Sequence, residues 1–275
     1  MTFAVISRSD GAAGGVHQRA RGSASIDIIL KDGVSLASLC REAGSARIRF
    51  PRPATARTCE AILINTAGGM TGGDVFATEV SVGEGAAVSL TTQAAEKVYR
   101  SLAGPACVGA RLTVARGGRI EWLPQETILF NGSSIERRLD ANVAEDGRLL
   151  IVEPVVFGRI EMGERLVAAD FHDRWRIRRN GRLIHAEASA LSGAVGDLLM
   201  RPAVLGGGRA MATILYVAPD AERFAEPLAL VLGEGGGASA FDGKLVGRVV
   251  ADDGFALSRR IAAAMAALRA APIVN

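Results

Sequence analysis

Residues 75–92 read VFATEVSVGEGAAVSLTT, two segments with apolar residues at alternate positions on either side of Gly83-Glu84-Gly85. Successive side chains of a β-strand point to opposite faces, so a period of two predicts strands with one buried face. The glycines between the segments are a turn signal. This stretch therefore predicts two short strands joined by a tight turn. The residues on their buried faces are Phe76, Val80, Val82, Val88, Leu90 and Thr92.

The same pattern recurs along much of the chain. It is seen at 46–50, 112–114, 120–122 and 135–143, with further turn signals at 116–118 and 145–147. A parallel βαβ protein needs a helix of ten or more residues in most intervals, and most intervals here are too short for one. The predicted fold is mainly β: an elongated, helical-coil-like or stacked array of many short strands with few helices, or a sandwich.

Two segments have helical patterns. Residues 220–232 follow Pro219 and end before Gly233, which are start and stop signals. Residues 253–271 have an alanine-rich interior and predict a C-terminal helix that Pro272 ends. We expect its apolar face to pack on the β core or on a partner. That face consists of Leu257, Ile261, Ala264, Met265 and Leu268.

The composition predicts a folded chain with a mildly basic surface. Hydrophobic residues are 49% and charged residues 22%, which argues against wholesale disorder. Residues 1–22 are rich in Gly, Ala, Ser and Arg and predict a loose leader before a single β-rich domain, 23–275. The net charge is +3, yet no basic run is interleaved with aromatics, so we expect no nucleic-acid binding. Acidic protein partners are a second interpretation of the charge.

Cysteine spacing and hydropathy predict a cytoplasmic location. Cys40, Cys59 and Cys107 are too far apart for a zinc motif and fit small buried residues in a reducing compartment. The first ten residues lack the features of a signal peptide. Residues 255–274 are apolar but interrupted by arginines, so we expect no membrane span.

The glycine-rich segment 61–74, AILINTAGGMTGGD, invites a phosphate-binding interpretation. A P-loop, however, requires Lys followed by Ser or Thr after its last glycine, and here Asp74 occupies that place. The spacing also misses the dinucleotide fingerprint, and the next segment alternates like a strand. The alternative is a glycine-dependent turn between two strands, with Asp74 bonding nearby amides.

No catalytic or tight metal-binding pattern is present in the sequence. His17, His172 and His185 are scattered, and no serine sits in a Gly-x-Ser-x-Gly elbow. The sequence therefore predicts a protein that is not an enzyme and has no tightly bound cofactor. Several carboxylates could pass a divalent cation along weakly, although each is also explained as a structural or surface acid. They are Asp74, Glu96, Glu126, Glu153, Glu161 and Glu164.

Residues 174–178, RWRIR, place Trp175 and Ile177 on one face of a strand and three arginines on the other. One interpretation is an amphipathic strand with a solvated face. The other is an arginine surface that docks on an acidic partner.

Four segments, taken together and in order, resemble the UreD (UreH) family of urease accessory proteins. They are 64–74 (INTAGGMTGGD), 91–101 (TTQAAEKVYRS), 121–130 (EWLPQETILF) and 157–164 (FGRIEMGE), with a weaker match at 178–183. Many family members carry Pro-Pro where this chain has Thr66-Ala67, a difference that affects turn stiffness more than chemistry.

The resemblance implies a mainly β scaffold that binds apo-urease and a UreF-type accessory protein, which in turn recruits a UreG-type GTPase. It also implies an internal polar passage for nickel in transit. Two other hypotheses remain: a glycine-loop nucleotide-binding enzyme and a basic nucleic-acid-binding module. Candidate residues for partner contacts or the nickel path are Asn65, Gly68, Gly69, Gly72, Gly73, Asp74, Glu96, Lys97, Glu126, Glu153, Arg159, Glu161 and Glu164.

Overall fold

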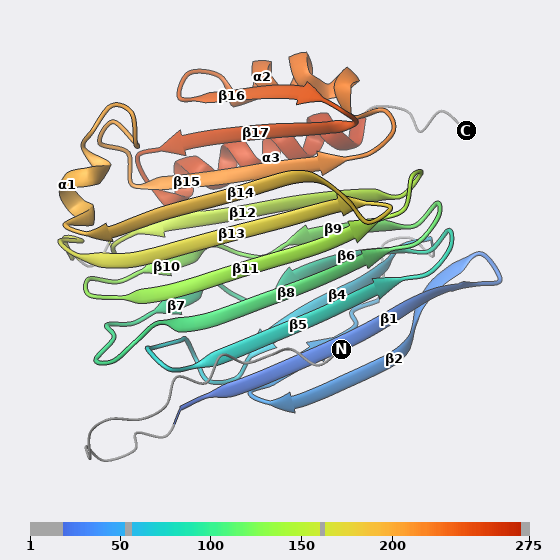
Figure 1. Cartoon of the computed structure of the whole chain (residues 1–275), viewed down its shortest axis with the longest axis horizontal. Helices are drawn as coiled ribbons and strands as arrows, with labels where there is room; N and C mark the ends of the chain where they lie inside the picture. Colours follow the sequence, from blue (N-terminus) through green and yellow to red (C-terminus); the bar gives the residue numbers. More distant parts are fainter. Residues whose placement is uncertain (1–18, 53–56, 160–162, 271–275) are drawn as a thin grey trace.

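The computed structural model describes residues 19–52, 57–159 and 163–270, which form two stacked β-sheets with helices at one end (Figure 1). The seven-stranded sheet has the order β14-β13-β11-β8-β5-β1-β2. The ten-stranded sheet has the order β16-β17-β15-β12-β9-β6-β4-β3, with β10 paired to β12 and β7 paired to β10. The mainly β prediction is confirmed.

The first nine strands are β1 (Arg21–Lys31), β2 (Val34–Gly44), β3 (Ala46–Arg49), β4 (Cys59–Asn65), β5 (Val75–Val82), β6 (Ala87–Thr92), β7 (Glu96–Val98), β8 (Ala106–Val114) and β9 (Arg119–Leu123). The others are β10 (Thr127–Leu129), β11 (Ser134–Val143), β12 (Arg148–Phe157), β13 (Ala169–Arg179), β14 (Arg182–Gly193), β15 (Ala210–Val217), β16 (Gly236–Phe241) and β17 (Lys244–Ala251). The helices are α1 (Val195–Leu199), the 3₁₀ turn η2 (Ala221–Phe224), α2 (Ala225–Leu232) and α3 (Gly254–Ala270).

The middle of the chain is a coil that passes back and forth between the two sheets, with the short strands β7 and β10 following β6 and β9 in the same sheet. β5, β8, β11 and β13 are parallel neighbours in one sheet, and β4, β6, β9 and β12 are parallel neighbours in the other. Each parallel crossover is thus made by a strand of the opposite sheet, so the chain needs no crossover helix. This is the stacked, coil-like arrangement that the short intervals predicted.

The three turns found in the sequence lie on top of one another at one end of the coil. The N–H of Gly85 donates to the carbonyl of Arg116. The N–H groups of Ala115 and Ala144 donate to the carbonyls of Val82 and Val114, each in the preceding turn of the coil. These bonds satisfy turn backbone groups that would otherwise lack partners. The turns therefore set the register of the coil.

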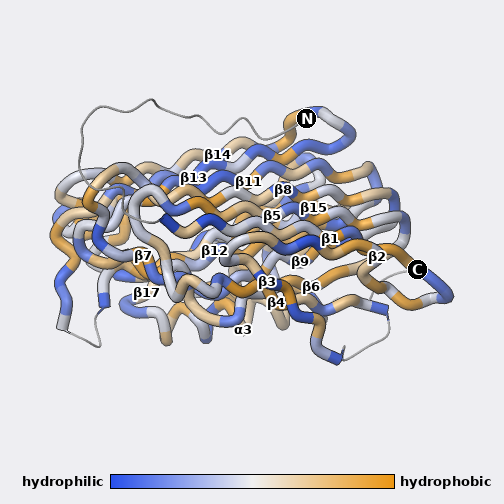
Figure 2. Tube along the Cα trace, turned by 90° about the horizontal axis from the view of Figure 1, so that it is seen from below, coloured by the Kyte–Doolittle hydropathy of each residue, from blue (hydrophilic) through white to orange (hydrophobic). Residues whose placement is uncertain are grey.

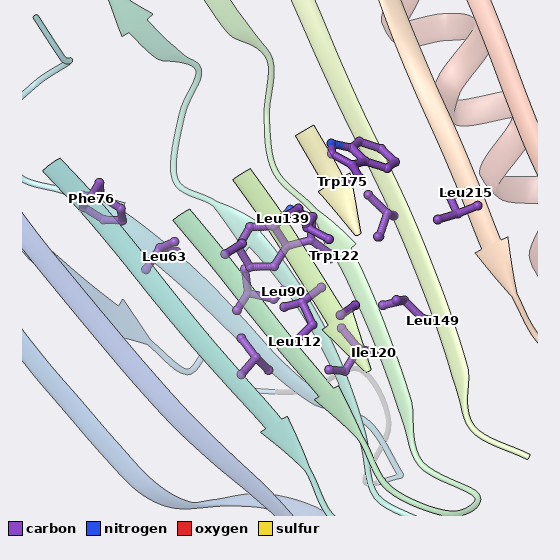
Figure 3. Close-up of a cluster of buried hydrophobic side chains, with 14 of the residues drawn as sticks. Leu63, Phe76, Leu90, Leu112, Ile120, Trp122, Leu139, Leu149, Trp175 and Leu215 are labelled. Atoms are coloured by element: carbon purple, nitrogen blue, oxygen red, sulfur yellow. The ribbon is translucent and has the colours of Figure 1, made fainter. Parts of the chain in front are cut away.

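The core lies between the two sheets, where side chains of alternate residues meet (Figure 3). Figure 2 shows the same alternation as hydrophilic and hydrophobic residues following one another along the strands. The apolar residues of the faces predicted at 75–92 are buried, with Val80 1% and Leu90 0% exposed, whereas Thr92 is half-buried. Phe50 departs from the predicted alternation, because β3 ends at Arg49 and Phe50 is exposed.

The helices α2 and α3 cover the outer face of the ten-stranded sheet at its β12–β16 end. Both predicted helices are present. The Asp253 carboxylate caps α3 by accepting the amide of Ala256, and Gly233 ends α2 with a positive φ of 62°. The short helix α1 was not predicted.

The division into a leader and a single domain stays a prediction. β1 begins at Arg21, two residues before the expected boundary at 23, and residues 1–18 lie outside the described part of the chain. Pro272, expected to end the last helix, also lies outside it.

Candidate functional site

Three charged side chains meet between the two sheets. Arg137 of β11 lies between Glu153 of β12 and Asp173 of β13 and bonds to both carboxylates. The distance from a terminal guanidinium nitrogen to Glu153 Oε2 is 2.8 Å. The three side chains are only 9–13% exposed. We call Arg137, Glu153 and Asp173 the charged cluster.

Two tryptophans and a threonine hold this cluster in place. Trp122 donates its indole N–H to Glu153 Oε1 at 2.7 Å, and Trp175 donates to Asp173 Oδ1 at 3.1 Å. Thr127 Oγ1 accepts a bond from Arg137 at 3.2 Å. Figure 3 shows both tryptophans among the side chains between the sheets. Buried carboxylates need such donors, since charge without partners is costly in a protein interior.

The cluster carries one more carboxylate than cation. Burial raises the pKa of Glu153, while the positive charge of Arg137 and the bond from Trp122 act against that rise. Burial works to lower the pKa of Arg137, but the charges of Asp173 and Glu153 outweigh it and raise that pKa above its usual value. The guanidinium therefore stays charged, and its Nε has no hydrogen-bond partner among the described residues.

A cavity of about 80 Å³ adjoins the charged cluster, which lines it together with Trp122 and Trp175. We call it the chamber. One water needs roughly 10–15 Å³ of such space, so the chamber has room for several. Its walls are mainly apolar, with polar groups from the charged cluster, including the unpartnered Arg137 Nε, set among them.

Glu96 lines another part of the same chamber. Asn65 donates to its carboxylate, with Nδ2 and Oε2 3.2 Å apart. Burial raises the pKa of Glu96; the Asn65 bond opposes this and the nearby charge of Asp74 adds to it. The chamber therefore has carboxylates from Glu96, Glu153 and Asp173 in its walls.

The ladder of backbone pairs on one side of β12 is interrupted beside the chamber. β12 pairs with β9 as far as Ile151–Trp122, and pairing resumes with β10 at Val155–Thr127. Pro154 lies in the gap and has no N–H to donate, and Pro124 lies opposite. We call this gap, residues 123–126 and 152–154, the window. It is roughly 10 Å long at about 3.3 Å per residue.

A groove of about 300 Å³ lies on the outer side of the window, between α3 and the ten-stranded sheet. We call it the outer groove. Pro124 and Gln125 line both the chamber and the outer groove, and Glu126 lines the groove. The backbone N–H of Gln125 donates to Thr92 Oγ1 at 2.9 Å. The window thus separates the chamber, with carboxylates among its walls, from a mostly apolar surface groove by a few side chains.

The glycine-rich segment forms a tight turn, as one of the two interpretations held. Gly68, Gly69 and Gly73 have φ values of 76°, 137° and 88°, a region that favours glycine. A Cβ at Gly72 would lie 1.9 Å from Ser101 Oγ. This turn packs against its neighbours and leaves no space at Gly72.

Asp74 is buried and both its oxygens accept backbone amides. Oδ1 bonds to the amide of Ala20 and Oδ2 to that of Thr71, each at 2.8 Å. The Asp74 carboxylate thus closes the turn by accepting backbone N–H groups. This supports the structural interpretation of Asp74.

The remaining candidates lie at the surface near one end of the coil. Arg159 forms an ion pair with Glu164, with Nε and Oε2 3.0 Å apart, and lies over the Phe130 ring. Lys97 is exposed, and Glu161 lies outside the described residues. The structure thus brings Glu96 and Glu153 to the chamber, with Asn65 bonded to Glu96, and leaves Arg159 and Glu164 apart from it.

Sequence reasoning missed Arg137 and Asp173. Both stand at core-facing positions of alternating strands, between Ile135 and Leu139 and between Phe171 and Trp175. A charge at such a position breaks the apolar pattern, and that break was the available signal.

Within residues 19–52, 57–159 and 163–270, no three His, Cys, Asp or Glu side chains are grouped as a metal site would require. His172 of β13 contacts Ser192, and His185 of β14 lies 3.5 Å from Glu187. The two histidines thus have separate partners. No described helix is long and apolar enough to cross a membrane.

Comparison with known proteins gives one consistent family. The family model described as "UreD urease accessory protein" matches residues 20–274. A urease accessory protein UreD 1 of Brucella abortus is 48% identical over 255 residues, 91% of each chain. Urease accessory proteins UreD of Brucella suis and Rhizobium leguminosarum bv. trifolii are each 47% identical, over 264 and 259 residues, covering 94% of each chain.

Proposed function

This chain belongs to the UreD family of urease accessory proteins, and on that premise we propose that it is a non-enzymatic scaffold that serves urease maturation. It binds apo-urease and a UreF-type accessory protein, through which a UreG-type GTPase joins the assembly. Nickel is its cargo rather than a resident cofactor, and the complex works in the cytoplasm.

The observation that supports this proposal is the set of three carboxylates in the otherwise largely apolar walls of the chamber beside the window. Its described lining contains Glu96, Glu153 and Asp173 but neither histidine nor cysteine. Imidazole and thiolate hold borderline metals such as nickel tightly, whereas carboxylates and water hold them loosely. A passage must release its cargo, so this set of oxygen ligands suits transit.

Arg137 keeps the chamber stable between passages of the ion. Its guanidinium bridges Glu153 and Asp173, which would otherwise face each other unpaired in the interior. A hydrated divalent cation competes with the guanidinium for the same carboxylates. Trp122 and Trp175 hold one oxygen of each carboxylate and leave the other oxygen directed to the cation or to Arg137.

Urease maturation in cells that express this chain with apo-urease and the other accessory proteins tests the proposal. Glu153→Gln keeps the size and the bond from Trp122 but removes the charge. We expect a complex that assembles normally and yields urease with a lower nickel content.

The matched control is Glu136→Gln, which changes an exposed acid on the outer face of β11. It should leave the nickel content of urease unchanged. Full nickel loading with Glu153→Gln would show that the chamber is not the route, and failure of the wild-type chain to co-purify with apo-urease would refute the scaffold role itself.

A further inference from the structure

The strand β14 lies at one edge of the seven-stranded sheet, and part of its backbone is unpaired. The N–H of Asp170 in β13 donates to the carbonyl of Ser133, next to β11. Because backbone groups alternate in direction along a strand, the even-numbered residues of β13 bond toward β11 and the odd-numbered ones toward β14. Ala186, Ala188 and Ala190 stand opposite even-numbered residues, so their N–H and C=O groups point to the free edge. Within the described part of the chain, no other backbone group bonds to these three alanines.

The free part of this edge has few of the features that keep edge strands from pairing, which include lysine, proline and bulges. Residues 186–192 contain neither proline nor lysine, and the bulge opposite Ile177 lies outside this stretch. Its one charged residue, Glu187, forms an ion pair with Arg248 of β17, with Oε1 and Nη2 2.6 Å apart. The stretch is therefore open to another strand.

The ten-stranded sheet extends past β14, so part of its inner face has no strand opposite it. Figure 1 shows β17 and β16 beyond β14. Val246 of β17 is half-buried, and Phe241 of β16 is 50% exposed on the face away from α2 and α3. A strand added to β14 would lie over this face and continue the packing of sheet on sheet.

The other side of the added strand would meet a basic surface. Arg174 and Arg176 of β13 lie directly opposite Ala188 and Ala186 on the outer face. Arg174 is exposed and has no partner among the described residues. Arg176 already extends across β14, with Nη1 3.3 Å from the carbonyl oxygen of Glu187.

The geometry lets these arginines reach the next strand. Strands lie about 4.8 Å apart, so an added strand is roughly 10 Å from β13. The alanines in between are too small to block an arginine and a glutamate that extend toward each other over them. Asp170, an acid on the same face of β13, lies opposite Ser192, so the basic end of the free edge is the one at Ala186 and Ala188.

We propose that the free edge of β14 binds an extended, acidic segment of a partner protein, which joins the seven-stranded sheet as one more strand. Its backbone bonds to Ala186, Ala188 and Ala190, and its carboxylates, at alternate positions, pair with Arg174 and Arg176. Its other side chains cover Val246 and Phe241. This inference rests on the proposed function in one respect, since a scaffold must bind other proteins.

Three short synthetic peptides, titrated into the purified full-length chain and followed by fluorescence anisotropy, test the inference. In the first, glutamate alternates with threonine. The second has lysine in place of glutamate, and the third keeps glutamate but has methyl groups on its backbone nitrogens, so it has no N–H to donate. We expect the glutamate peptide to bind at least about tenfold more tightly than either of the others.

Two variants separate the backbone from the charge. Ala188→Pro removes a free-edge N–H without breaking a bond to β13, and edge strands tolerate proline at such positions. Arg174→Glu reverses a charge and leaves the backbone unchanged. Each change should weaken binding of the glutamate peptide by about tenfold or more.

Each variant has a matched control. Ala188→Ser keeps the N–H that proline removes, and Arg259→Glu makes the same charge change at an exposed position of α3, which covers the other sheet. Both should leave the dissociation constant unchanged. Thermal unfolding of every variant checks that lost binding does not come from lost structure, and Arg174→Glu keeps the test valid where Ala188→Pro unfolds.

The outcomes separate this inference from the scaffold role. If the wild type does not bind the glutamate peptide, or binds the methylated one equally well, strand addition is wrong; co-purification with apo-urease would still support the scaffold. If the peptide binds as expected but the chain does not co-purify with apo-urease, the scaffold role fails and the edge site stands. If Ala188→Pro changes only the oligomeric state of the chain by light scattering, the edge pairs with a second copy, and the acidic segment is refuted.

Discussion

Trp122 of β9 donates its indole N–H to Glu153 of β12 with Nε1 and Oε1 2.7 Å apart, and so joins the two strands by a side-chain bond beside the window. The backbone ladder between these strands stops at Trp122 and Ile151. The side-chain bond therefore lies where the backbone bonds end. It fixes the carboxylate in the chamber and helps hold the window's edges at a set distance.

Trp122→Phe tests the energetic value of this bond. Phenylalanine fills much of the same space but has no N–H, so we expect a loss of about 2 kcal/mol in the free energy of unfolding, typical of a hydrogen bond to a charged group. Urea unfolding measures it. Repeating the change in a Glu153→Gln background should give a smaller loss, and an equal loss in both backgrounds would mean that packing alone accounts for the effect.

Arg137→Met should destabilise the protein by about 3–5 kcal/mol, because it leaves the carboxylates of Glu153 and Asp173 buried without a counter-charge. The neighbouring Arg138 points outward and its side chain is 68% exposed, so Arg138→Met should change stability by no more than about 0.5 kcal/mol. Chemical denaturation of both variants checks this. Adding Glu153→Gln and Asp173→Asn should restore much of the stability lost with Arg137, and no restoration would contradict the charge explanation.

Glu96→Gln should stabilise the protein at neutral pH. Burial raises the pKa of Glu96 above its ordinary value of 4.5, so between 4.5 and the raised value the folded chain binds a proton that the unfolded chain does not. The wild-type free energy of unfolding therefore falls as pH rises through that pH range. Glutamine at position 96 removes this loss. Denaturation midpoints at a series of pH values should converge at low pH and separate as pH rises.

Glu164 provides a control of opposite sign. The bond from Arg159 is the main cause that holds the pKa of Glu164 below 4.5. The stability that Glu164 contributes is thus present above 4.5 and lost as pH falls through the lowered value. Glu164→Gln should be less stable than wild type at neutral pH, with the difference vanishing in acid. If Glu96→Gln and Glu164→Gln showed the same pH trend, the opposite directions of the two pKa shifts would be contradicted.

Asp74→Asn should weaken the fold and leave nickel delivery intact. An amide has one acceptor oxygen, so it can replace only one of the bonds from Ala20 and Thr71, at a cost of about 1.5–3 kcal/mol. Unfolding experiments measure that cost. Urease matured by the variant complex should have near-normal nickel content; nickel-poor urease from a fully assembled complex would place Asp74 on the metal path.

The isolated protein should bind nickel only in the micromolar range or more weakly, because oxygen ligands without histidine or cysteine hold this metal loosely. Isothermal titration calorimetry with nickel chloride measures the affinity. One nanomolar site in the full chain would show that other residues assemble a true metal site. Under the same conditions the protein should hydrolyse neither GTP nor ATP.

Period-two patterns were enough to predict the strands and a mainly β stack, sandwich or coil, because a strand that buries one face must place apolar residues at alternate positions. The glycine turn and the C-terminal helix were equally visible, since glycine with positive φ and helical spacing are local properties. Arg137 and Asp173 were not found, because their meaning depends on which strands become neighbours. Parallel pairing of β11 with β13 sets Arg137 opposite Asp173, and only the fold reveals that register.

The interrupted ladder at the window has a kinetic meaning. A small hydrated solute that crossed an intact parallel sheet would first have to break backbone hydrogen bonds, each of which contributes about 1 kcal/mol net and more if its groups are left dry. On the side of β12 that faces β9 and β10, residues 152–154 make no backbone pairs, so the way there is closed by side chains such as Gln125 and not by a hydrogen-bond ladder. Exposed side chains change rotamer in picoseconds to nanoseconds, whereas local unfolding of a sheet takes microseconds or longer. The rigid coil can therefore have a fast gate without a moving domain.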